Sequence, residues 1–138
     1  TVMRQVRGTV NSVELIGWIG DAPEQRVFAS GAKVCTFNVA TKHWGARGET
    51  GDRGIETDWT PVEAWEKLSE QAMRFLHKGS RVRVIGSMRT QSWEDRESGQ
   101  RRYKTFVRAN EILFLDYRSD SNGQDLPEAV EETEDVPF

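Results

Sequence analysis

Four of the five tryptophans in this 138-residue chain stand where flat rings and positive charge could act together. Trp44 lies between Lys42 and Arg47, and Trp93 follows Arg89 on what reads as the same strand. An indole ring offers a flat apolar face for stacking, and a neighbouring cation can neutralise an anionic group of the same ligand. A tryptophan more often packs in a core or an interface. Whether the indole faces the core or the outer surface therefore decides whether it can bind a ligand.

The spacing of Trp59 and Trp65 places both indoles on the outside of a strand. They are six residues apart, so in an extended chain both side chains point to the same side. Glu63 shares that side and is a poor core residue, whereas Val62 and Ala64 lie on the opposite side. We therefore expect both rings on the outer surface.

Exposed indoles beside cations are typical of a surface that binds unpaired nucleobases. A base in a single strand has two open faces, and stacking one on an aromatic ring contributes ~1–3 kcal/mol with little dependence on its identity. A duplex covers those faces, and few side chains here are arranged to read base edges. The pattern predicts tight binding to single strands, with little dependence on sequence.

The residues offer no set for catalysis, a metal or a cofactor, and we expect none of the three. Cys35 is the only cysteine, and His43 and His77 are far apart, which excludes a disulfide scaffold and a zinc module. The Gly45–Gly54 segment reads as a long mobile loop and matches neither a phosphate-binding loop nor a dinucleotide fingerprint. Glu63 is a lone carboxylate without a mate. The chain is therefore expected not to be an enzyme.

The charge is divided unevenly along the chain. Residues 1–118 hold all 19 basic residues and 15 of the 22 acidic ones, for a net charge of +4, and residues 119–138 hold the other seven acids. The body could attract a polyanion. The acidic end could be a solubilising tail, could bind a basic partner, or could compete for the groove of the body. No apolar run is long enough to span a membrane, so we expect a soluble, cytoplasmic protein.

A hydrophobic period of two dominates the body, which predicts an all-β fold. One segment, from Glu66 to Lys78, has the helical period, with Leu68, Ala72, Phe75 and Leu76 on one face and Gly79 as the stop. The expected strands are Val10–Ile19, Lys33–Lys42, Glu56–Trp65, Arg81–Trp93 and Arg102–Tyr117. Five strands with one helix between the third and fourth is the order of the OB-fold, a Greek-key barrel.

This interpretation divides the chain into two parts. Residues 1–117 would form the barrel, with Cys35, Phe37 and Val39 on its inner face, so that Cys35 is a core residue rather than a nucleophile. Residues 118–138 are too polar to be buried and are expected to be disordered.

Several short stretches, in order, resemble the bacterial single-stranded DNA-binding proteins. They are Val10–Gly17 followed by Gly20 and Pro23–Glu24, then Phe37–Thr41, Thr57–Trp59, Lys78–Ser80, and Gly86–Thr90 before Trp93. The resemblance implies stacking of DNA bases on Trp44, Trp59, Trp65 and Trp93. It also maps phosphate contacts onto Arg47, Lys67, Lys78 and Arg89, and Lys42 beside Trp44 joins this set. The family implies a homotetramer and a nucleoid-associated location.

The last residues resemble the acidic tip through which the family recruits replication, recombination and repair proteins. They are Glu134, Asp135, Val136, Pro137 and Phe138. A terminal phenyl ring and its carboxylate can enter an apolar pocket rimmed by basic residues, while the upstream acids steer the encounter.

The chain departs from the family pattern at three positions, Trp18, Thr60 and Pro61. We expect Trp18 to pack at a subunit interface rather than to serve as a fifth stacking site. Three other functions remain open at this point. They are single-stranded RNA binding by an OB protein, carbohydrate binding without phosphate contacts, and an adaptor that acts only through its acidic tip.

Overall fold

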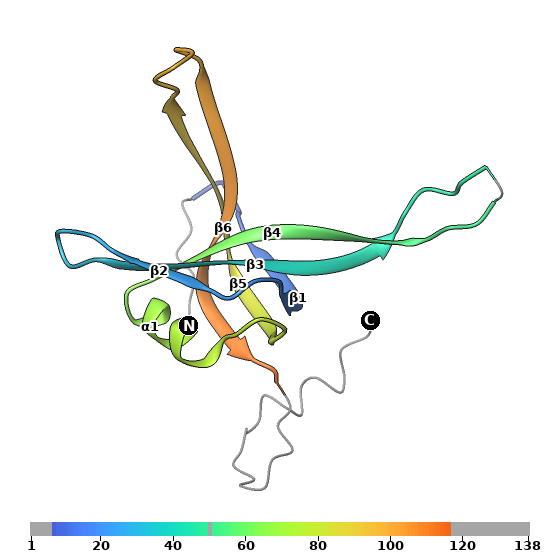
Figure 1. Cartoon of the computed structure of the whole chain (residues 1–138), viewed down its shortest axis with the longest axis horizontal. Coiled ribbons are helices and arrows are strands. Elements are labelled where there is room, and N and C mark those ends of the chain that lie inside the picture. The colour runs from blue at the N-terminus through green and yellow to red at the C-terminus, as the bar shows by residue number, and fades with distance from the viewer. Residues whose placement is uncertain (1–6, 50, 117–138) are drawn as a thin grey trace, which may run out of the picture.

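The computed structural model describes residues 7–49 and 51–116, which form strands and one helix. Their order is β1 (Val13–Ile19), β2 (Glu24–Val27), β3 (Lys33–Trp44), β4 (Ile55–Trp65), α1 (Lys67–Phe75), β5 (Arg81–Glu94) and β6 (Arg101–Phe114). Figure 1 shows the strands forming a central barrel. The predicted tail, 118–138, and the predicted domain boundary lie outside the described residues.

Five strands close the barrel, as the OB-fold prediction requires. The sheet order is β1-β5-β6-β4-β3-β2, and β1 also pairs with β3. All pairings are antiparallel except the short one between β4 and β6, which sets Val62 beside Val107 and Glu63 beside Arg108. With the helix between β4 and β5, the arrangement confirms the predicted Greek-key barrel.

Two glycines permit the close backbone approaches that closure needs. β1 pairs with β5 from Val13 to Trp18 and with β3 at Trp18 and Ile19, and a Cβ on Gly17 would lie 2.0 Å from the carbonyl oxygen of Ala40. A Cβ on Gly86 would lie 2.0 Å from the carbonyl oxygen of Arg108, where a register shift in the β5–β6 ladder marks a bulge. Bulges of this kind bend a sheet sharply enough to close it.

The core lies inside the barrel and consists mainly of small β-branched residues. Val39, Val62, Val82 and Val84 are completely or almost completely buried. Cys35 lies among them, and its burial raises the pKa of the thiol to about 11, so the sulfur stays protonated at neutral pH. This confirms the prediction that Cys35 is a core residue.

The helix α1 packs against β3, β4 and β6 and also contacts β2. Ser69, Ala72 and the following Leu76 are buried, and the Gln25 side-chain amide donates to Ser69 Oγ over 3.1 Å. The helix is shorter than predicted because it ends at Phe75, with Leu76 already extended. His77 and Lys78 therefore lie in the turn that ends at Gly79 rather than in the last helical turn.

Three further predictions about the elements were wrong. Phe75 is 51% exposed rather than buried with the apolar face of α1, and it rests on Phe114 with 5.2 Å between ring centroids. β1 begins at Val13, because Val10 has no ladder partner and is exposed. The strand β2 was not expected at all: its four residues are all exposed, so they show no alternation.

Two hairpins extend beyond the barrel as arms (Figure 1). We call residues 42–59 the β3–β4 arm and residues 88–105 the β5–β6 arm. Within the described residues of these ranges only Gly45 is buried, although the strands of both arms are continuous with strands of the barrel. The arms point in different directions, away from α1 (Figure 1).

Candidate nucleic-acid interface

Trp44 lies near the end of β3, in the β3–β4 arm. Its side chain is 60% exposed, and its ladder partner Ile55 is exposed as well. The loop that follows is closed at its base by hydrogen bonds, since the Gly45 amide donates to the Gly54 carbonyl over 2.8 Å and Arg53 Nε donates to the Gly45 carbonyl over 3.0 Å. The arm therefore presents the Trp44 indole to solvent.

His43 adds a titratable group beside Trp44. Its Nδ1 lies 3.1 Å from the Trp44 carbonyl oxygen, and its Nε2 lies 3.4 Å from Asp58 Oδ2 and 3.9 Å from Glu56 Oε1. The hydrogen bond to the Trp44 carbonyl, together with the two carboxylates, raises the pKa of His43 above its ordinary value, against a smaller opposing effect of burial. The imidazole thus keeps its proton to a higher pH and partly offsets the two acids on this arm.

Trp93 occupies the equivalent place in the β5–β6 arm. It is 45% exposed and pairs across the ladder with Arg102, whose Nε donates to Asp95 Oδ2 over 3.1 Å. Strand alternation and the ladder register put Arg89 and Lys104 on the same face as Trp93. The predicted association of Trp93 with Arg89 on one side is confirmed.

Tyr103 is an aromatic residue of the same arm that sequence reasoning missed. It is 67% exposed and lies on the opposite face of the ribbon, together with the exposed side chain of Met88. Its position between Arg102 and Lys104 was the available signal, since it repeats the pairing of a flat ring with cations that singled out Trp93.

Trp59 lies against Gly20, the residue that follows β1. It is 56% exposed, as predicted, and a Cβ built on Gly20 would lie only 2.3 Å from Cζ3 of the indole. Its ladder neighbour Ala40 points outward yet is buried. The ring is therefore held against the barrel wall, and the space above Gly20 exists because that residue has no side chain.

Trp65 is on the predicted outer side, but it is less open than expected. Val62 and Ala64 are buried on the inner side, which confirms the alternation. The indole is only half-buried rather than open, because Phe28 stacks on it with ring centroids 5.8 Å apart, and the Arg108 guanidinium lies 5.3 Å from its centre. The indole N–H also donates to Glu63 Oε1 over 3.1 Å.

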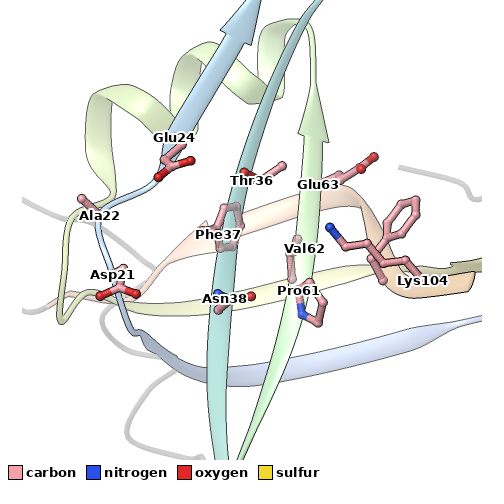
Figure 2. Close-up of a pocket in the computed structure, with 11 residues that line it drawn as sticks. Asp21, Ala22, Glu24, Thr36, Phe37, Asn38, Pro61, Val62, Glu63 and Lys104 are labelled. Carbon is pink, nitrogen blue, oxygen red and sulfur yellow. The ribbon is translucent and has the colours of Figure 1, made fainter. Parts of the chain in front are cut away.

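A groove runs along the barrel wall beside Trp65. Its larger part has a volume of about 730 Å³ and is lined by Phe28, Trp65, Arg89, Lys104 and Arg108 among others. It continues into a smaller pocket of about 210 Å³ that shares Glu63 and Lys104. Figure 2 shows this pocket with Lys104 on one side and Asp21 and Glu24 on the other. A groove of this size can hold a nucleotide.

The five basic residues named for phosphate contacts are all exposed, but they do not gather in one place. Lys42 and Arg47 lie in the β3–β4 arm, and Arg89 lies in the β5–β6 arm. Lys67 begins α1, and Lys78 lies in the turn after it. Three of the five thus accompany exposed indoles and two flank the helix, and their contacts with phosphate stay predictions.

Two cations lie over the ring of Trp18. Lys42 Nζ lies 5.5 Å and the Arg81 guanidinium 5.6 Å from the centre of the indole. Cation–π contacts of this kind hold both charged groups over the barrel wall. Trp18 faces outward, as the alternation predicts, and its role at a subunit interface stays a prediction.

The predicted partner-binding tip lies outside the described residues, so the structure does not test it. Within residues 7–49 and 51–116, no group of three or more histidine, cysteine or acidic side chains is arranged to hold a metal ion. In the same part of the chain, no helix has the length and apolarity that a membrane span requires.

Comparison with known sequences identifies several relatives of similar length. The model of the Single-strand binding protein family matches residues 10–115. A protein of Synechocystis named single-stranded DNA-binding protein 1 is 35% identical over 82% of this chain and 89% of its own length. Proteins of the same name from Xylella fastidiosa and Chlorobaculum tepidum are 34% and 33% identical, each over 83% of this chain and over 83% and 70% of their own lengths.

A solved structure shares the fold. The Plasmodium falciparum SSB in complex with single-stranded DNA superposes with a TM-score of 0.70 at 28% identity, covering 81% of this chain and all of that one. The family match includes the barrel and both arms. On these grounds this chain belongs to the single-strand binding protein family.

Proposed function

We propose that this protein binds single-stranded DNA on the outer wall of its barrel and on its two arms, with little regard to base sequence. The observation that carries the proposal is the exposure of Trp44, Trp59 and Trp93, each of which has about half of its surface open to solvent. Its family membership, and the single-stranded DNA in the complex of its structural relative, support the same ligand.

Binding would consist of stacking and charge neutralisation without a chemical step. Each base that stacks on an indole contributes ~1–3 kcal/mol, nearly independently of its identity. Lys42, Arg47 and Arg89 stand beside these rings and would contact the phosphates between the stacked bases. A protein that binds only the open strand shifts the equilibrium of a hairpin towards melting by mass action.

The wider role follows from the resemblance to the family rather than from geometry. We propose that the protein coats unpaired strands during replication, recombination and repair, and that it assembles as a homotetramer in the cytoplasm. The acidic tip, Glu134–Phe138, would recruit partner proteins. Deleting Asp135–Phe138 should then abolish capture of partners and leave strand binding intact.

One fluorescence titration tests the proposed ligand. The protein is titrated with a thymidine oligomer, the matching uridine oligomer and a duplex, each at two salt concentrations. We expect strong quenching of indole emission by the first, weaker quenching by the second and the least by the third. Log affinity should fall with log salt at a slope of about −0.7 per phosphate neutralised.

Other outcomes point to other functions. Equal or stronger binding of the uridine oligomer would favour an RNA-binding protein. Binding without salt dependence would favour a carbohydrate ligand, because sugars carry no phosphates. Absence of any binding to the thymidine oligomer would overturn the proposal.

A further inference from the structure

Phe28 is an aromatic residue in the groove that no family motif or sequence pattern pointed to. It follows β2 directly, and its backbone amide donates to the Ala32 carbonyl over 2.8 Å, which fixes the turn into β3. Its ring stacks on Trp65 almost in parallel, with 5.8 Å between centroids and 10° between planes. Phe28 is nevertheless 38% exposed, so part of its ring remains open to the groove.

Cations accompany both rings of this stack. The guanidinium of Arg26 lies 5.9 Å from the centre of Phe28, and that of Arg108 lies 5.3 Å from the centre of Trp65. Arg108 is also 4.0 Å from Glu63, the acceptor of the Trp65 indole N–H. Glu63 thus engages both the indole and the arginine above it, which holds Trp65 in one orientation.

The groove leads from this stack towards the β5–β6 arm. Arg89 and Lys104 line it together with Phe28 and Trp65. Because these two cations share the face of the arm that carries Trp93, a strand that stacks on Trp93 would be guided along that face into the groove. Two flat rings with cations on either side are the features that bind an unpaired base and its phosphates.

We propose that Phe28 is a further base-stacking residue and that Phe28 and Trp65 together form one two-ring platform for the strand. This inference rests on the proposed function and extends it to the residue after β2, which the motifs left without a role. Because the two rings are already stacked on each other, little side-chain freedom is lost when a base joins them.

Three substitutions separate stacking from mere support of Trp65. Phe28→Ala removes the ring and its volume, Phe28→Leu keeps apolar volume against Trp65 without a flat face, and Phe28→Trp keeps a flat face. If Phe28 stacks a base, Phe28→Leu should weaken binding of a thymidine oligomer about fivefold or more, as Phe28→Ala does, while Phe28→Trp retains it.

The matched control is Phe75→Leu. Phe75 is also an exposed phenyl ring packed on an aromatic neighbour, Phe114, and it also lies under a guanidinium, that of Arg74, at 5.5 Å. It is on α1 rather than in the groove, so this substitution should leave affinity unchanged. Urea denaturation of each variant checks that the fold is intact.

The outcomes distinguish the two proposals. If the unchanged protein does not bind the oligomer, the proposed function fails. If it binds, and Phe28→Leu binds equally well, Phe28 only supports Trp65 and this inference fails. The salt dependence gives a second readout: loss of a stacked base leaves the slope of log affinity against log salt unchanged, whereas a lower slope in Phe28→Leu would mean that the ring acts by placing arginines and would overturn the inference.

Discussion

The barrel and its arms are built from the same strands, yet they bury their residues differently. In β5, Val82 and Val84 are buried in the barrel, whereas Met88 and Trp93 on the same strand are exposed in the arm. β3 shows the same change between buried Val39 and exposed Trp44. One strand therefore serves the core at one end and a surface at the other.

This difference separates stability from binding. Apolar residues in the barrel are covered by the protein itself, so each contributes to folding. A two-stranded ribbon has no second layer to cover it and is marginal on its own, so the exposed rings of the arms need a ligand or another copy of the chain. We therefore expect substitutions of the exposed rings in the arms to change affinity and substitutions inside the barrel to change stability.

The largest effect is expected when both arms lose their indoles. In Trp44→Ala/Trp93→Ala, two stacked bases lose their partners, which should cost about 2–6 kcal/mol of binding free energy if the two losses add. Titration with a thymidine oligomer measures the loss. The free energy of unfolding should change by no more than about 0.5 kcal/mol, because neither ring is part of the core. A variant that loses stability but keeps its affinity would show that these arm residues serve folding rather than binding.

The barrel counterpart is Gly17→Ala. The added methyl group would lie 2.0 Å from the Ala40 carbonyl oxygen, so β1 and β3 must separate where they close the barrel. We expect a loss of about 1–3 kcal/mol in the free energy of unfolding, measured in urea. Gly54→Ala is the control, since nothing lies near its Cβ position. The folded Gly17→Ala protein should bind the oligomer normally, and a selective loss of binding would contradict this separation.

Trp59 lies where the two regions meet, and Gly20→Ala tests how it is held. The new Cβ would lie 2.3 Å from Cζ3 of the indole, so the ring has to shift. Binding of the oligomer should weaken by about 1 kcal/mol, with little change in stability. In a Trp59→Ala background the same substitution should have no further effect on affinity. Additive losses would show that Gly20 acts on something other than Trp59.

The smallest effect is expected from His43 in the β3–β4 arm. Because folding raises the pKa of His43, the stabilisation is fully present below the pKa of the unfolded chain and is lost as pH rises through the higher folded pKa. The ordinary pKa of histidine is ~6.5, and the two test pH values lie below and above it. The difference in stability between the unchanged protein and His43→Gln should therefore be greater near pH 5.5 than near pH 8.5. Urea titrations across this range measure it. Asp58→Asn should reduce the difference, and a difference that grows with pH would contradict the assignment.

The barrel was predictable from the sequence because burial on one face leaves a period of two. Val62 and Ala64 alternate with Trp59 and Trp65, and the structure places the two pairs on opposite sides. The exposure of Trp44, Trp59 and Trp93 followed from the same alternation and from their neighbouring charges.

Other features could not be found because no local pattern encodes them. β2 is exposed along its whole length, so it has no apolar alternation and is formed only by its pairing with β3. The contact between Phe28 and Trp65 joins residues far apart in the chain and depends on β3, which pairs with β2 on one side and with β4 on the other. Phe75 fits the helical period, but α1 ends there, so the ring turns outward onto Phe114.

The most direct test of base stacking on the exposed indoles is a set of single-tryptophan proteins, each with the other four indoles replaced by phenylalanine. Every protein is titrated with a thymidine oligomer while its indole emission is recorded. We predict strong quenching for the proteins that retain Trp44, Trp59 or Trp93, and little for the one that retains Trp18, whose ring Lys42 and Arg81 cover. Unchanged emission from all three exposed indoles at saturating DNA would contradict the account.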